Sequence, residues 1–151
     1  GICGKTSIEA VQTACKVLTK KNFSIDNQMI ADIPDRVAAL QTVYRHTGGI
    51  HAAALLKADG EVLLMREDIG RHNAVDKVIG AGLVEEIKFE ECILFVSGRA
   101  GFELVQKSGM AGISMMVAVG APSSLSVNLA KNLGIQLFGF TRDNKFNLYT
   151  D

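Results

Sequence analysis

Apolar and polar positions repeat with two different periods along this chain, which predicts both helices and strands. Apolar residues at intervals of three and four predict a first helix from about Ser7 to Lys20, with Cys15 on its buried stripe. The same spacing predicts a second helix that Asp32 caps, that carries Pro34 in its first turn and that ends at Gly48-Gly49. The residues expected on its buried face are Ile33, Val37, Leu40 and Tyr44.

A hairpin and then alternating strands and helices are predicted for the rest of the chain. Two strand patterns, His51 to Lys57 and Glu61 to Arg66, flank Asp59-Gly60, which is a strong hairpin signal. This order predicts one domain over residues 1–151, with a mixed sheet that carries helices on both faces. The later strands, with helices expected between the first three, are Cys92 to Val96, Ile113 to Val119, Ile135 to Phe140 and Phe146 to Tyr149.

The composition is that of an ordinary globular protein and narrows the range of partners. Of the 151 residues, 48% are hydrophobic and 21% charged, and sixteen basic residues balance sixteen acidic ones. We therefore expect no nucleic-acid partner and no membrane surface held by bulk charge. No apolar run approaches the roughly 20 residues that span a bilayer. Three cysteines do not suggest a disulfide framework, which favours a reducing, cytoplasmic setting.

Polar side chains collect at three junctions where a predicted strand is followed by a helix. Because the carboxyl ends of parallel strands meet at one edge of a sheet, we expect these junctions to share one site. Arginines, hydroxyl groups and helix N-termini together favour an anion, above all phosphate. Neither a Walker-type motif nor a Gly-x-Gly-x-x-Gly fingerprint occurs. The residues expected at this site are Arg71, His72, Asn73, Ser97, Gly98, Arg99, Ser123, Ser124 and Arg142.

Other candidates lie outside these junctions. His51 stands at the head of a strand beside Gly48-Gly49, where it either reaches the site or serves as a structural histidine. Cys3 precedes the first predicted helix and lies close to Lys5, and both the helix end and the ammonium group favour a thiolate. Cys15 and Cys92 fall on apolar patterns and are expected in the core. Cys3 is therefore the cysteine that we expect to react.

Four segments of the chain carry a joint resemblance to a known family. They are Thr47-Gly48-Gly49-Ile50-His51, Glu67-Asp68-Ile69-Gly70-Arg71-His72-Asn73-Ala74, Ser97-Gly98-Arg99 and Ala121-Pro122-Ser123-Ser124. Together they resemble the formate dehydrogenase accessory sulfurtransferases, the FdhD/NarQ family, and the resemblance extends from Cys3 to Tyr149. It implies a three-layer α-β-α fold like that of cytidine deaminase. It also implies that Cys3 is the second, catalytic cysteine of a Cys-x-x-Cys pair, whose first member and an upstream segment we expect to be missing here.

The resemblance further implies a function, a cofactor and partners. It implies a sulfurtransferase that passes sulfur from a cysteine desulfurase to the molybdenum cofactor of formate dehydrogenase, bis-molybdopterin guanine dinucleotide. It suggests a homodimer. No thiol is available near His72 at the junctions, so we expect no zinc or other resident metal. Glu67 and Asp68 would repel phosphate, so we expect them to orient the arginines or to read the N–H edge of guanine. The family's cofactor-binding segment maps to Gly139, Phe140, Thr141, Arg142, Asp143 and Asn144, with Asp143 where glycine is usual.

Two functions from other classes remain open at this point. The implied fold would permit a zinc deaminase, although that chemistry needs a His/Cys-x-Glu motif at one helix start and a Pro-Cys-x-x-Cys at the next. The junctions read Arg71-His72-Asn73-Ala74 and Ser97-Gly98-Arg99-Ala100-Gly101, which contain no cysteine. The second alternative is a non-catalytic chaperone that holds the cofactor while formate dehydrogenase matures. A persulfide that moves to the cofactor would distinguish the sulfurtransferase from the chaperone.

Overall fold

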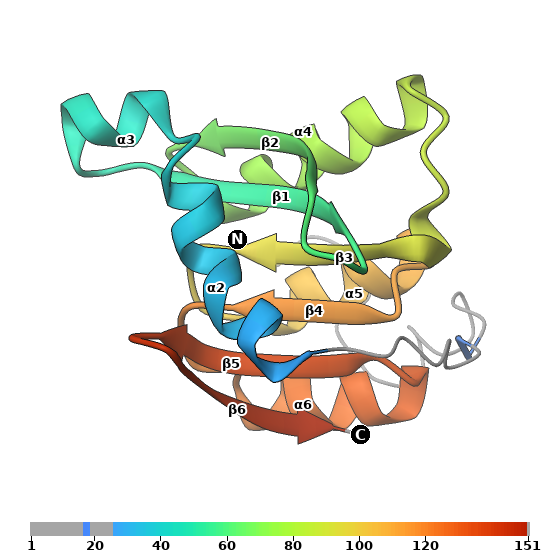
Figure 1. The fold of residues 1–151 in the computed structure, drawn as a ribbon. Helices are drawn as coiled ribbons and strands as arrows, with labels where there is room; N and C mark the ends of the chain where they lie inside the picture. The colour runs from blue at the N-terminus through green and yellow to red at the C-terminus, as the bar shows by residue number, and fades with distance from the viewer. Residues whose placement is uncertain (1–16, 19–25, 151) are drawn as a thin grey trace.

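The computed structural model describes residues 17–18 and 26–150, and it shows a six-stranded sheet between two layers of helices (Figure 1). The strands are β1 (His51–Lys57), β2 (Val62–Asp68), β3 (Cys92–Val96), β4 (Met115–Ala118), β5 (Gln136–Arg142) and β6 (Lys145–Thr150). The helices are α2 (Asn27–Ala38), α3 (Thr42–Thr47), α4 (Arg71–Val84), α5 (Phe102–Ala111) and α6 (Ser124–Leu133), and a 3-10 turn, Phe89–Glu91, precedes β3.

The strand order places four strand ends on one edge of the sheet. The order is β2-β1-β3-β4-β5-β6, with β3, β4 and β5 parallel to one another. β1 runs antiparallel to both β2 and β3, so β2 has the same direction as the parallel strands. β6 returns antiparallel to β5. The predicted mixed sheet is confirmed. The carboxyl ends of β2, β3, β4 and β5 lie at the same edge of the sheet, whereas β1 begins there.

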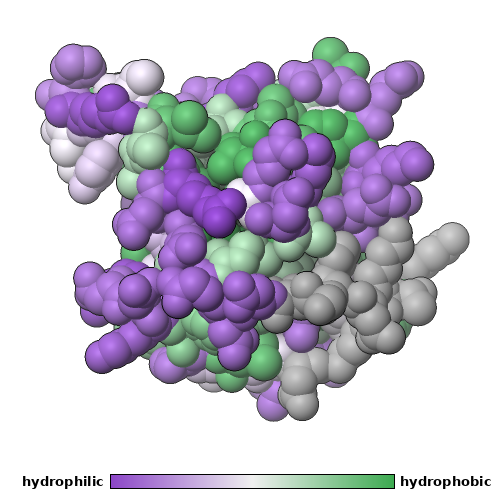
Figure 2. All heavy atoms as spheres, viewed as in Figure 1, coloured by the Kyte–Doolittle hydropathy of each residue, from purple (hydrophilic) through white to green (hydrophobic). Residues whose placement is uncertain are grey.

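Each face of the sheet carries its own core, which confirms the three layers. One core packs α4, α5 and α6 against the sheet through residues such as Val78, Leu104 and Leu129. The other core packs α2 through Ile30, Ile33 and Val37. Because both faces are covered, every residue of β3 and β4 is buried, as the uninterrupted apolar runs predicted. Figure 2 shows that hydrophilic residues cover most of the outer α2 side.

The helix predicted between Asp32 and Gly48 is instead two helices. Asp26, not Asp32, caps α2, since its carboxylate accepts the Gln28 N–H at 3.1 Å, and Pro34 lies well inside this helix. The chain then turns, and α3 begins after Gln41 and ends at Gly48 in the left-handed conformation. The break rotates the second half away from the core, which leaves Leu40 and Tyr44 each 47% exposed. The expected burial of Leu40 and Tyr44 is therefore wrong, whereas that of Ile33 and Val37 is confirmed.

Only Val17 and Leu18 of the first predicted helix belong to the described part of the chain, and neither is helical. The Leu18 N–H donates to the Leu133 carbonyl at 2.9 Å, so it is not part of an intrahelical ladder there. Cys3 and Cys15 lie outside the described residues. Cys92 is 2% exposed, which confirms its predicted place in the core. None of the helices in the described residues has the length and apolarity that a membrane span needs.

Candidate functional site

Glycines allow the loops after β3, β4 and β5 to lie against one another at the shared edge. The Gly120 N–H donates to the Gly98 carbonyl at 3.0 Å, and the Phe140 N–H donates to the Gly120 carbonyl at 3.2 Å. A Cβ on Gly120 would lie 3.0 Å from the Cα of Arg99, and one on Gly139 would lie 2.9 Å from Cδ of Pro122. The predicted junctions after β3 and β4 therefore meet, and the end of β5 joins them, as expected for Arg142. The absence of a side chain at Gly120 and Gly139 allows these close approaches.

His51, Ser97 and Arg71 surround the loop that follows β3. β1 runs antiparallel to β3, so His51 at its start reaches the same edge. Ser97 Oγ accepts the Ala52 N–H at 2.9 Å and lies 3.4 Å from His51 Nδ1, to which the hydroxyl can donate. A Cβ on Gly98 would lie 3.3 Å from both Arg71 Cδ and His51 Cε1. The structure thus brings four predicted site residues into contact, although their binding role stays a prediction.

A cavity of about 500 Å³ opens at this edge between the sheet, α2 and α3. Its volume lies in the range of small-molecule sites and would admit a nucleotide. Apolar residues of the sheet form part of the lining, and His51 and Ser97 supply polar groups. The segment that connects α2 to β1 also lines the cavity, through Gln41, Tyr44, Gly48, Gly49, Ile50 and His51.

Arg71 is the most enclosed of the three arginines predicted at the site. Its Nε is buried and has no hydrogen-bond partner in the described structure, whereas Arg99 and Arg142 are exposed. Its guanidinium Nη2 lies 4.0 Å from where a Cβ on Gly101 would stand, beside the N-terminus of α5. A buried donor without a partner is costly, so an anion that accepts from Arg71 would recover part of that cost. Arg71 is therefore the strongest candidate clamp.

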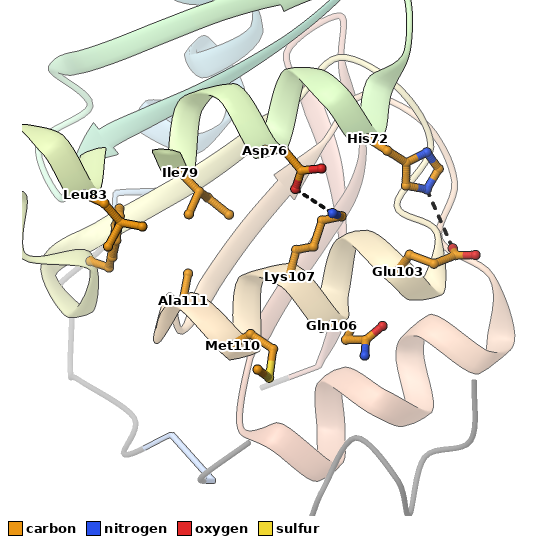
Figure 3. Close-up of a pocket in the computed structure, with 10 residues that line it drawn as sticks. His72, Asp76, Ile79, Leu83, Glu103, Gln106, Lys107, Met110 and Ala111 are labelled. Atoms are coloured by element: carbon orange, nitrogen blue, oxygen red, sulfur yellow. Dashed lines mark hydrogen bonds and ion pairs between the residues drawn. The ribbon is translucent and has the colours of Figure 1, made fainter. Parts of the chain in front are cut away.

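His72 and Asn73 face away from the cavity beside His51. His72 Nε2 lies 3.7 Å from Glu103 Oε2 across the gap between α4 and α5 (Figure 3). It lines a second cavity of about 720 Å³ between these helices, where Lys107 also pairs with Asp76 at 2.5 Å. Asn73 donates to Asp68 Oδ1 at 3.2 Å. The structure therefore separates His72 and Asn73 from the His51–Ser97 pair, although the sequence had predicted that all four residues share one site.

The two predicted serines lie at the start of α6. Ser123 is the N-cap, because its Oγ accepts the Ser126 N–H at 3.2 Å and lies 2.6 Å from Ser126 Oγ. Ser123 and Ser124 are both exposed. The Ser123 N–H donates to the Ala100 carbonyl at 3.4 Å, which holds this helix start beside the loop after β3. The serines thus share the predicted edge, but the Ser123 hydroxyl already has a capping role.

The predicted cofactor segment forms the end of β5 and its hairpin with β6. Asp143 and Asn144 are the two turn residues, and their φ values of 53° and 58° are typical of a type I′ turn. Asp and Asn tolerate this left-handed conformation, which explains how Asp143 replaces the usual glycine. Asn144 Oδ1 accepts from Gln28 Nε2 at 3.0 Å, so the hairpin is tied to α2.

The residues that precede the turn combine strain with exposure. Phe140 has φ 52° and is 40% exposed, which is unusual for a bulky residue. It lies in an irregular stretch between Gly139 and Arg142, where the register of β5 and β6 shifts. Thr141 is fully buried, and its Oγ1 has no partner within the described structure. Such local strain occurs often at ligand sites, which agrees with the predicted role of this segment.

Glu67 and Asp68 do not orient the arginines, so that expectation is wrong. Glu67 accepts the N–H groups of Val43 and Tyr44, each at 2.9 Å, at the start of α3. Partial burial raises the pKa of Glu67, but hydrogen bonds from Val43, Tyr44 and Gln41 outweigh it and leave the pKa below its ordinary value. The partners of Glu67 lie more than twenty residues upstream, so no local pattern could have indicated this contact.

Asp68 holds the start of α4 instead. It pairs with Lys77 at 2.5 Å and accepts the Gly70 N–H at 2.9 Å. Lys77 and then the Gly70 N–H lower the pKa of Asp68 to about 2. An aspartate two residues before Gly70 is a local turn signal that could have indicated this role from the sequence. Both carboxylates therefore serve helix starts and are not free to read a guanine base.

The described residues include no group of three His, Cys, Asp or Glu side chains placed to hold a metal ion. At the two junctions where a zinc deaminase would carry its ligands, His72 is the only such donor among the predicted site residues, and its neighbour is Glu103. Cys92, the one cysteine in the described part, lies in the core. This donor set does not fit the three or four close ligands of zinc.

Comparison with known proteins identifies the family. The FdhD/NarQ family model matches residues 1–151. The chain is 47% identical to proteins of Streptomyces coelicolor and Thermoplasma volcanium, each named "Sulfur carrier protein FdhD", over 99% of this chain and 54% of each relative. A crystal structure from Desulfotalea psychrophila, described as a formate dehydrogenase accessory protein, matches with a TM-score of 0.77 and 28% identity over 84% of this chain and 54% of that one. The chain thus spans about half the length of these relatives. The resemblance expected from the junction motifs is confirmed, and the chain belongs to the FdhD/NarQ family.

Proposed function

We propose that this chain acts in a sulfur carrier that takes sulfur from a cysteine desulfurase and delivers it to bis-molybdopterin guanine dinucleotide for formate dehydrogenase. The observation that carries the proposal is the 47% identity, along 99% of the chain, to relatives named as sulfur carriers. The proposed carrier thiol is Cys3, on the sequence argument that a helix end and Lys5 favour its thiolate. The cofactor is the acceptor of the sulfur and is treated as a substrate.

In this proposal the cofactor binds along the edge where the strand ends meet. Arg71, Arg99 and Arg142 hold its phosphates, because a guanidinium donates two parallel hydrogen bonds to phosphate oxygens. The cavity of about 500 Å³ beside His51 holds a part of the cofactor about the size of a nucleoside. Two features support this arrangement: the unpartnered Nε of Arg71 and the contacts that join the loops after β3, β4 and β5.

A non-catalytic chaperone is the second candidate, and the choice between the two functions depends on Cys3. Cys92, the only thiol in the described part, is buried, and burial raises its pKa to about 11, so it would not carry sulfur. Incubation with a desulfurase and ³⁵S-cysteine, followed by addition of the cofactor, distinguishes the two functions. A carrier takes up label that reductant releases and then loses it to the cofactor. A chaperone binds the cofactor but takes up no label.

Binding of nucleotides tests the cofactor site separately. We expect GDP to bind more tightly than ADP, since the proposed cofactor carries guanine. Replacing Arg142 by alanine should weaken GDP binding by about 1.5–3 kcal/mol, the scale of a hydrogen bond to a charged group. Calorimetric titration measures both effects. Lys131→Ala is a matched control, because it also removes a positive charge but lies in the last turn of α6, away from the strand ends.

Two results would contradict these expectations. Equal affinities for GDP and ADP would remove the guanine preference. An Arg142→Ala protein with wild-type affinity for GDP would remove Arg142 from the site.

A further inference from the structure

α3 forms one wall of the cavity beside His51, yet its own side chains hold it only weakly. None of the residues from Thr42 to Thr47 is buried, and Val43 and Tyr44 are 42% and 47% exposed. Figure 1 shows α3 projecting beyond the sheet at the upper left. A helix of six residues is not stable on its own, so contacts at its two ends must fix its position.

The N-terminal end of α3 is held by Glu67, which comes from β2. Glu67 Oε2 accepts the Val43 N–H and Oε1 accepts the Tyr44 N–H, each at 2.9 Å. The N-cap residue, Gln41, makes no capping bond with its own side chain, but its Nε2 lies 3.5 Å from Glu67 Oε1. A carboxylate that accepts two free N–H groups at a helix start is a strong cap, and its charge suits the positive end of the helix. Glu67 therefore replaces the local cap that α3 lacks.

The C-terminal end of α3 leads directly into the cavity. Gly48 ends the helix with φ +64°, and Gly49 and Ile50 connect it to His51 at the start of β1. Half of the residues that line the cavity belong to the segment from Gln41 to His51. In the sheet, Glu67 pairs with Ala52 and Asp68 pairs with His51. The Glu67 carboxylate on β2 thus fixes the N-terminal part of the segment from Gln41 to His51, and His51 at the C-terminal end of that segment lines the cavity.

We propose that Glu67 is a positioning residue that sets the shape of the nucleotide-binding cavity by holding α3 in place. It is not among the residues that line the cavity, and both of its oxygens accept N–H groups of α3. This inference rests on the proposed function only in assigning GDP to that cavity. Glu67 holds α3 through its two hydrogen bonds whether or not GDP is the ligand.

A series of three side chains at position 67 tests the proposal. Glutamine keeps one acceptor and loses the charge, whereas alanine loses both, so the effects should increase from Glu67→Gln to Glu67→Ala. In the ligand-free protein, hydrogen exchange followed by NMR should show the Val43 and Tyr44 amides exchanging about tenfold faster in Glu67→Ala, a change within the range for loss of a helix cap. Amides between β1 and β3 should keep wild-type exchange, which shows that the sheet remains folded.

The same variants are then titrated with GDP. We expect the Kd to rise by about three- to tenfold in Glu67→Ala and by less in Glu67→Gln, since ligand binding must then also order α3. Glu61→Gln is the matched control, because it removes a carboxylate from the same hairpin, where Glu61 pairs with Lys57 at 2.5 Å on the exposed turn. That control should leave both the exchange of α3 and the Kd for GDP unchanged.

Three outcomes decide the proposal. Unchanged exchange of Val43 and Tyr44 in Glu67→Ala would show that Glu67 does not hold α3. Faster exchange with an unchanged Kd for GDP would show that α3 does not shape the nucleotide site. If the wild-type protein binds no GDP, the nucleotide part of the proposed function fails, and the exchange measurement still decides whether Glu67 holds α3.

Discussion

Replacing Arg71 by alanine should weaken GDP binding by about 1.5–3 kcal/mol, which is about 10- to 150-fold in Kd. The physical reason is that Arg71 Nε is already buried and has no partner in the described structure. An anion bound there gains a hydrogen bond without further desolvation of that donor. Arg99, like Arg142, is exposed, so a bond to phosphate competes with water, and Arg99→Ala should have an effect near the low end of that range. Calorimetric titration of the two variants measures the difference.

Arg71→Lys is the control that separates charge from geometry. Lysine keeps the positive charge but cannot donate two parallel hydrogen bonds, so it should recover only part of the affinity. An Arg71→Ala protein that binds GDP as the wild type does would place the anion elsewhere. Full recovery by Arg71→Lys would show that charge alone is sufficient.

Replacing Gly120 by alanine should lower the free energy of unfolding by about 1–3 kcal/mol, the usual cost of forcing an extra group into a packed site. The added Cβ would stand 3.0 Å from the Cα, N and Cγ atoms of Arg99. Two of these are backbone atoms, so the loops after β3 and β4 would have to separate. Denaturant unfolding measures the change in stability.

Gly80→Ala provides the matched control for that substitution. Gly80 lies inside α4, and a Cβ there would meet nothing within 4 Å. Alanine at a compatible helical position should raise the free energy of unfolding by about 0.4–1 kcal/mol. The two glycine substitutions should therefore have opposite signs. A Gly120→Ala protein as stable as the wild type would show that the loops are not packed as closely as described.

The sheet could be predicted because its strands carry strong local signals. β3 is a buried apolar run, and Asp59-Gly60 marks the hairpin, where Gly60 has φ +83°. The helices before β1 were harder to predict. Ile33 and Val37 indicated a buried face correctly, but the same period continued across the turn at Leu40. There α2 ends in local turn bonds, in which the Leu40 N–H donates to the Val37 carbonyl at 3.0 Å. Periodicity alone does not show where one helix stops and the next begins.

The candidate site could be predicted only as far as strand ends define it. The expectation that strand ends share one edge correctly placed Ser97, Gly98 and Arg71 together. It also placed His72 at this edge, but the His72 side chain lies toward Glu103 on α5. Adjacent residues at the start of a helix point in different directions, so a junction in the sequence does not specify which side chain reaches the cavity. The capping role of Glu67 depends on a contact with a distant segment, and such contacts leave no local pattern.

Sulfur loading of Cys3 is the property that the proposed function requires most directly. The protein would be incubated with a cysteine desulfurase and cysteine and then analysed by mass spectrometry, first intact and then by peptide mapping. We predict a mass gain of one sulfur atom on the peptide that contains Cys3, removed by reductant and absent from Cys3→Ser. No mass gain, or a gain that maps to Cys15 or to the buried Cys92, would contradict a carrier role for Cys3.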